Sequence, residues 1–225
     1  VVTPENLAEV QAASMRLHAL PRMIKVKPHK GQRAHTWLSA DQVSALYAVC
    51  DDGTRGLRDR ALLGLMLTTG IRRGELVKLE WADVIRQPTG DGVRSILNVI
   101  EGKGNKDRSI PLNRDMEAVL DKWGHKVKRR GRVARSLTPA LGIGKSLSVT
   151  QINNIVSKRG EQAGIPNLAP HDLRRTAAQT WYNATGDILL VSELLGHSSV
   201  ETTRRYIQTD QGKKLAAVRA VQWST

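Results

Sequence analysis

Residues 168–206, which read LAPHDLRRTAAQTWYNATGDILLVSELLGHSSVETTRRY, decide how the rest of the sequence is interpreted. His171 and Arg174 lie three positions apart in a segment that we expect to form the first turn of a helix. Residues at that spacing share one helix face, so both side chains could bind one phosphate. A single H-x-x-R pair on a helix is more often a solvated surface than a site, so it needs support from its surroundings.

A second helix is expected directly downstream, over residues 188–195. Asp187 is a residue type that caps helix N-termini, and Gly196 suits the left-handed position that ends a helix. The run between them is apolar, which indicates a buried helix. His197 would then lie at the end of that helix, although a histidine there is usually only a neighbour of the cap.

The tyrosine of this stretch is expected in a third, short helix. Ser198 and Glu201 form a capping-box pattern that predicts its start. Tyr206 lies about two helical turns beyond His197. A lone tyrosine is usually a half-buried aromatic, but the order H-x-L-R-R-T, then L-G-H, then tyrosine is much harder to reach by chance.

This combination resembles the catalytic domain of the tyrosine recombinases, the family of phage integrases and of recombinases that resolve chromosomes and plasmids. The family implies a second arginine upstream, in a T-G-[LIM]-R-x-x-E-L segment, and TTGIRRGEL supplies Arg72 and Glu75. It also implies a lysine in a β-turn, and EGKGNKD supplies Lys103, with Lys106 as the runner-up. The motifs occur in the family's order across residues 37–225.

These residue types suit attack on a phosphodiester, which resists a nucleophile because it is an anion and gains charge in the transition state. Arg72 and Arg174 can each offer paired N–H groups that match phosphate geometry. His171 and His197 can add single hydrogen bonds from other directions. Losing one such donor typically costs about 3 to 4 kcal/mol of transition-state stabilisation. Four donors could therefore replace a metal ion.

The resemblance makes Tyr206 the catalytic nucleophile. Attack would give a 3′-phosphotyrosine and a free 5′ hydroxyl, with Lys103 protonating the leaving oxygen. The step conserves bond energy, so it is reversible and needs no ATP. Glu75 would support the site by orienting Arg72, although a simple salt bridge explains this pair when it is taken alone.

The charge balance indicates a polyanionic partner. The 225 residues include 35 Lys and Arg against 21 Asp and Glu, which gives a formal charge of +14 and a pI near 10.4. This balance favours double-stranded DNA, whereas no long apolar span supports a membrane protein. The single cysteine, Cys50, excludes an internal disulfide and reads as a packed thiol. We expect a cytoplasmic protein, encoded by a bacterium or a phage and associated with the nucleoid.

Metal and nucleotide cofactors are not expected. The sequence has no H-E-x-x-H motif, no paired cysteines and no clustered carboxylates, which are the patterns typical of metal sites. It also has no glycine-rich P-loop, so nucleotide hydrolysis has no support.

We predict two parts. Residues 37–225 should form a mainly α-helical α+β catalytic domain, tyrosine-recombinase-like, with a small β-hairpin or sheet at one edge. Residues 1–36 should be a basic linker with room for the last helix of a truncated core-binding domain, because six basic residues and no acidic residue occur from Arg16 to Arg33. A flexible lead-in and a strap along DNA phosphates explain this segment equally well.

Local patterns also predict the elements of the catalytic domain. Besides the three helices above, we expect helices that start at Ser39, span residues 58–68, run from Asn113 to Trp123, start at Ser148 and span residues 210–221, and strands at residues 93–100 and 108–112. The helix at residues 58–68 is apolar on most of its surface and should be central to the core.

Three functions remain open on the sequence. The resemblance favours a site-specific recombinase or integrase, which implies a homotetramer on paired DNA sites, with room for an accessory directionality protein. A type IB topoisomerase uses a similar set of residues but would relax any supercoiled plasmid as a monomer. A non-catalytic basic DNA-binding module would bind DNA in a salt-sensitive way and form no covalent adduct. The L-G-H motif and the small hairpin favour the recombinase.

Overall fold

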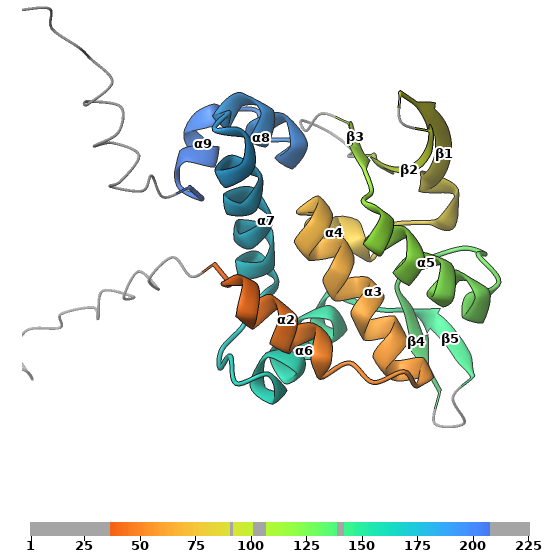
Figure 1. Cartoon of the computed structure of the whole chain (residues 1–225). Coiled ribbons are helices and arrows are strands. Elements are labelled where there is room, and N and C mark those ends of the chain that lie inside the picture. The colour runs from red at the N-terminus through yellow and green to blue at the C-terminus, as the bar shows by residue number, and fades with distance from the viewer. Residues whose placement is uncertain (1–36, 91, 101–106, 139–141, 208–225) are drawn as a thin grey trace, which may run out of the picture. The chain divides into compact units, whose positions relative to one another are not determined.

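The computed structural model describes residues 37–90, 92–100, 107–138 and 142–207 (Figure 1). The predicted basic linker at residues 1–36, both candidate lysines and the expected final helix lie outside these residues. Within the described residues, none of the helices is both long and apolar enough to cross a membrane.

Helix α3 (Thr54–Thr69) is the centre of the fold, as the apolar sequence predicts, although it starts at Thr54 rather than at residue 58. Most of its residues are buried, and it packs against α5 (Arg114–Val127) and α7 (Pro170–Thr185). In Figure 1, α4 (Arg73–Leu76) continues the chain just beyond the C-terminal end of α3, and α7 runs beside α3. The end of α3 is therefore the place where distant segments of the chain meet.

The other described helices are shorter or peripheral to α3, and most begin where the sequence predicts. They are α2 (Ala40–Ala48), α4 (Arg73–Leu76), the 3₁₀ turn η1 (Trp81–Asp83), α6 (Val149–Gln162), α8 (Ile188–Leu195) and α9 (Val200–Arg204). Ser39, Asn113, Ser148 and Asp187 cap their helices as predicted, each side chain accepting a backbone N–H.

The predicted cap of α9 is wrong by one residue. Ser199, not Ser198, accepts the backbone N–H of Glu201. The reason lies at the end of α8, where the His197 N–H donates to the Ser192 carbonyl at 3.0 Å. This closing hydrogen bond extends the turn past His197, so Ser198 stays in the link between the helices.

The described residues form two small antiparallel sheets, one with the order β1-β2-β3 and one with the order β4-β5. Their strands are β1 (Val84–Thr89), β2 (Gly92–Val99), β3 (Arg108–Pro111), β4 (Arg135–Leu137) and β5 (Ile143–Ser146). Strands β2 and β3 confirm the predicted hairpin. Strand β1 was not predicted because VIRQPT lacks alternation, and its Pro88 is tolerated only at the edge of a sheet.

Leucine, valine, isoleucine and tryptophan fill the main core in a chain that has no phenylalanine. Trp123 is fully buried and donates its indole N–H to the Val133 carbonyl at 2.9 Å, which satisfies its polar atom. Cys50 is also buried, as the prediction of a packed thiol requires.

A second, smaller apolar cluster lies where α7 and α8 meet. Its buried members are Ala178, Val191 and Leu195, and the half-buried Trp181 and Tyr206 pack against them. Tyr206 thus packs against residues of α7 and α8.

Candidate active site

The site is built around the sharp turn that ends α3. Gly70 adopts the left-handed conformation with φ of 57°. A Cβ at Gly70 would lie 3.0 Å from the Leu195 side chain and 3.2 Å from that of Trp181. Only glycine combines this conformation with such close packing, so the turn brings α3 directly against α7 and α8.

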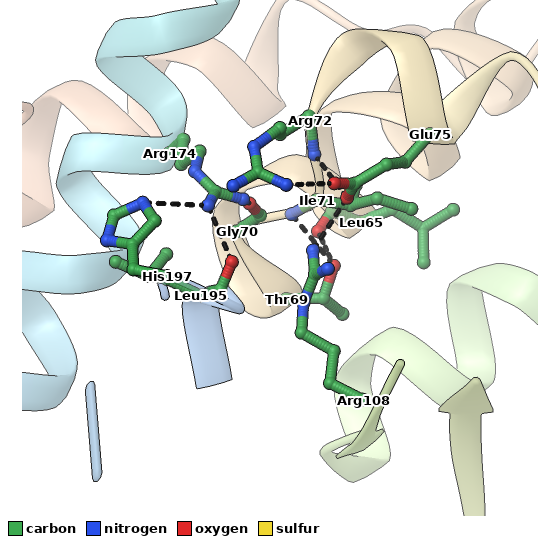
Figure 2. Close-up of polar contacts among 10 residues, drawn as sticks. All are labelled: Leu65, Thr69, Gly70, Ile71, Arg72, Glu75, Arg108, Arg174, Leu195 and His197. Carbon is green, nitrogen blue, oxygen red and sulfur yellow. Dashed lines mark hydrogen bonds and ion pairs between the residues drawn. The ribbon is translucent and has the colours of Figure 1, made fainter. Parts of the chain in front are cut away.

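Arg174, on the first turns of α7, is the most buried charge of the site, with an exposed fraction of 2%. Its guanidinium donates to the Gly70 carbonyl, to the Leu195 carbonyl at 2.6 Å, and lies 3.1 Å from Nε2 of His197 (Figure 2). The two carbonyls belong to the C-terminal ends of α3 and α8, where a helix carries partial negative charge. Burial, and then the charge of Arg72, lowers the pKa of Arg174 to about 10, so it stays protonated at neutral pH.

Glu75 holds two further guanidinium groups. It accepts hydrogen bonds from the Arg72 side chain at 2.8 Å, from the Arg72 backbone N–H at 2.9 Å and from Arg108 at 2.6 Å (Figure 2). Burial alone would raise the pKa of Glu75, but the hydrogen bond and charge of Arg108, and then those of Arg72, bring it below its ordinary value. The predicted pairing of Arg72 with Glu75 is therefore present, and Glu75 is an anion at neutral pH.

Arg108 is a site residue that the sequence interpretation missed. Its side chain is 4% exposed, compared with 33% for Arg72. The sequence does contain a pattern that could have predicted it. Arg108 and Ile110 alternate with exposed residues along β3, which places both side chains on the inner face of the sheet. An arginine on such a face needs a buried carboxylate as its partner.

Arg72 and Arg174 line one cleft of about 640 Å³, together with Glu75 and His171. His171 and Arg174 therefore face the same space, as their three-residue spacing on α7 predicts. Arg73 and Lys78 also line this cleft. Its lining therefore contains more cationic side chains than carboxylates. Its charge and size suit a phosphate group.

Both histidines pack against the Tyr206 ring. The ring centroids of His171 and Tyr206 are 5.1 Å apart in an edge-to-face arrangement, and those of His197 and Tyr206 are 5.2 Å apart. The Arg175 guanidinium carbon lies 5.8 Å from the centre of the same ring. Tyr206 is thus held among cationic and imidazole groups, one of which, His171, lines the cleft.

Both histidines have lowered pKa values. Loss of water contact, followed by the charges of Arg175 and Arg174, lowers the pKa of His171. Desolvation, followed by the charge of Arg174, lowers the pKa of His197 to about 4. Both imidazoles are therefore neutral at neutral pH, which makes them proton acceptors as well as donors.

The structure brings together all but one of the residues that the sequence singled out. Those gathered around the cleft and the tyrosine ring are Arg72, Glu75, His171, Arg174, His197 and Tyr206. Lys103 lies outside the described residues, as does its alternative Lys106. Among the described residues, no group of three or more metal-binding side chains is close enough to hold an ion.

Comparisons with known proteins identify the family and the fold of this chain. The model of the phage integrase family matches residues 36–213. The tyrosine recombinase XerC of Corynebacterium efficiens is 34% identical over 172 residues, which cover 76% of this chain and 53% of that protein. XerC of Vibrio cholerae is 30% identical over 198 residues, covering 86% of this chain and 60% of that protein. The chain thus spans between half and two thirds of these relatives' length.

Solved structures share the fold. The crystal structure of XerA recombinase superposes with a TM-score of 0.67 and 25% identity, covering 84% of this chain and 66% of that one. XerH recombinase bound to palindromic difH substrate gives a TM-score of 0.64 at 22% identity, over 81% of this chain and 51% of that one. The mainly helical α+β fold predicted from the sequence is confirmed. With a family model that matches most of its length, this chain belongs to the phage integrase family.

Proposed function

We propose that this chain is the catalytic part of a site-specific DNA recombinase or integrase, which cuts and rejoins strands through a 3′-phosphotyrosine. The observation that carries the proposal is the position of Tyr206, whose ring centroid lies 5.1 Å from that of His171 and 5.2 Å from that of His197, while His171 lines the same cleft as Arg72 and Arg174. The candidate nucleophile thus lies next to two proton-transfer groups, and one of these shares a cleft with the two phosphate-binding groups.

The two arginines would bind the scissile phosphate in different ways. Arg72 is one third exposed, is fixed by Glu75 and lines the cleft, so its guanidinium can meet a phosphate at the surface of the cleft. Arg174 donates one N–H of each terminal nitrogen to a backbone carbonyl and a third N–H to Nε2 of His197, out of the five that a guanidinium has. Neither side chain has to reorganise much to stabilise the charge of the transition state.

The chemical step follows from these positions. The Tyr206 oxygen attacks phosphorus, the bond from phosphorus to the 5′ oxygen breaks, and a 3′-phosphotyrosine forms. The phenolic proton passes to a neutral imidazole, for which His171 is our choice because it packs against Tyr206 and also lines the cleft. We assign protonation of the leaving 5′ oxygen to Lys103, on the family motif alone, with Lys106 as the alternative.

The substrate and assembly are also proposals. The formal charge of +14 supports double-stranded DNA as the partner. Among the structures with the same fold, XerH is bound to its difH substrate and lambda integrase is a dimer bound to a core site. We extend this to a homotetramer on paired DNA sites, acting in the cytoplasm at the nucleoid, with room for an accessory directionality protein.

The test is a covalent adduct on nicked DNA that carries the sequence flanking the coding gene. Wild-type protein should form an adduct that survives denaturing electrophoresis, and Tyr206→Phe should abolish it while DNA binding persists. Tyr182→Phe is the matched control, because Tyr182 packs in the same small apolar cluster and should keep the adduct. An adduct that survives in Tyr206→Phe would remove Tyr206 from its role.

The same assay separates the competing functions. Relaxation of supercoiled plasmids that lack the flanking sequence, by a monomer, would favour a type IB topoisomerase. Salt-sensitive binding without any adduct would favour a non-catalytic DNA-binding module. Strand exchange that requires two matching sites is the result that the recombinase predicts.

A further inference from the structure

Thr203 has a place in the site that its sequence position does not reveal. It lies on α9, is fully buried, and its Oγ1 is 2.8 Å from Nδ1 of His197. The other ring nitrogen of His197, Nε2, is 3.1 Å from the Arg174 guanidinium. His197 is therefore held at both ends of its ring.

The contact with Arg174 determines which nitrogen of His197 carries the proton, because the Thr203 hydroxyl can donate or accept. A guanidinium has only donors, so the Arg174 N–H must donate and Nε2 of His197 must accept. The proton of a neutral imidazole is then on Nδ1, and it is donated to Oγ1 of Thr203. The neutral state agrees with the pKa of His197, which desolvation and then the charge of Arg174 lower to about 4.

Thr203 also contacts the segment that carries the nucleophile. The Tyr206 backbone N–H donates to the Thr203 carbonyl at 2.9 Å. One buried residue is thus bonded through its side chain to His197 and through its backbone to Tyr206. The His197 and Tyr206 ring centroids are 5.2 Å apart. The two hydrogen bonds of Thr203 connect these residues directly and so help to fix the distance between their rings.

We propose that Thr203 is a positioning residue that accepts the Nδ1–H of His197 and so holds its ring in register with Tyr206. The effect on cleavage rests on the proposed function, whereas the hydrogen bond to His197 does not. Without the acceptor on Thr203, the Nδ1–H of His197 would be a buried donor with no partner. The imidazole would then lose its fixed orientation between Arg174 and α9.

Three variants test the proposal. Thr203→Val keeps the shape and removes the acceptor, and Thr203→Ser keeps the hydroxyl. Thr202→Val makes the same change at the exposed neighbour of Thr203 and is the matched control. Melting temperatures should be recorded for all three, so that a loss of folding is recognised.

The primary measurement is ¹⁵N NMR of the full chain labelled at its six histidines, without DNA and at neutral pH. The His197 signals, assigned by their absence in His197→Gln, should show a protonated Nδ1 and an unprotonated Nε2. Thr203→Ser and Thr202→Val should keep this pattern, and Thr203→Val should shift the Nδ1 signal, because its proton loses the acceptor. Wild-type protein with the proton on Nε2 would overturn the proposal, even if Thr203→Val fails to fold.

The second measurement is the rate of adduct formation at saturating DNA. We expect Thr203→Val to lower it by about 10- to 100-fold, the usual effect of removing the partner that orients a functional histidine in metal sites. Thr203→Ser should restore most of the rate and Thr202→Val should leave it unchanged. Equal losses in the two valine variants would refute a specific role of Thr203. If wild-type protein forms no adduct, the proposed function fails, and the NMR result still decides the tautomer.

Discussion

The two ends of α3 carry the same set of charges, one carboxylate between two guanidinium groups. Near the N-terminal end, Asp59 accepts a hydrogen bond from Arg58 at 2.8 Å and another from Arg159 at 2.9 Å. Just past the C-terminal end, Glu75 is held in the same way by Arg72 and Arg108. The chain thus contains a matched pair of ion clusters, one at each end of its central helix.

The clusters differ in the exposure of one side chain. The side chains of Arg58, Asp59 and Arg159 are all less than 10% exposed. In the other cluster Arg72 is 33% exposed and lines the cleft with Arg174. A buried ion pair contributes little net stability but is costly to break. At one end of α3 this set of charges is buried and holds the fold together. At the other end it supports Arg72, which is exposed to the cleft.

The largest expected effect is on stability at the closed cluster. Asp59→Asn leaves Arg58 and Arg159 buried without a charged partner, which should destabilise the fold by about 3 to 5 kcal/mol and lower Tm by roughly 6 to 20 °C. Calorimetry measures this loss. The rate of adduct formation per folded molecule should not change, and a matching drop in that rate would mean that the two clusters are not separate in role.

The next effect is on catalysis at the open cluster. Arg72→Lys keeps the charge but cannot pair with both a carboxylate and a phosphate in the geometry of a guanidinium. Adduct formation should fall by about 10²- to 10³-fold, as for the loss of one preorganised donor. Arg58→Lys is the control at the other end and should change only Tm. Wild-type rates in Arg72→Lys would contradict a phosphate-binding role for Arg72.

A smaller effect is expected for the residue that supports Arg72 indirectly. Arg108→Met removes one of the two guanidinium groups that fix Glu75, so Glu75 and Arg72 gain freedom. We expect adduct formation to fall about tenfold, measured in single turnover. Arg159→Met makes the same change at Asp59 and should alter stability alone.

The smallest effect is a pH dependence of stability near the open cluster, where His197 lies beside Arg174. The pKa of His197 is lowered to about 4, while an unfolded histidine has a pKa of about 6.5. As the pH falls below about 6.5, the unfolded chain binds a proton that the folded chain does not, so stability is lost toward pH 4. His171 contributes in the same direction. Urea unfolding across this range should show a shallower loss in His197→Gln, and an unchanged slope would contradict the lowered pKa.

The comparison also shows what the sequence could reveal. Helix caps and the pairing of Arg72 with Glu75 are local, because partners three residues apart on one turn meet whatever the rest of the chain does. The candidate catalytic set was predicted from its motifs. Arg108 is 33 positions from Glu75 in the sequence, and such a pairing depends on how the sheet packs against α4.

Other features were missed for the same physical reason. The bond between Thr203 and His197 requires the turn from α8 to α9 to close as it does. That turn also decided between two adjacent serines as the cap of α9, which composition cannot distinguish. Strand β1 exists because β2 offers it an edge, although its own sequence does not alternate and contains Pro88.

The acceptors of Arg174 have a last consequence for control of the reaction. Its guanidinium is bonded to the final carbonyl of α8, and the chain continues from there to His197 and Tyr206. If α8 and α9 moved away together, the site would lose Tyr206, His197 and one anchor of Arg174 in a single event. Under the proposed function, withdrawal of the tyrosine would then also weaken the binding of the scissile phosphate.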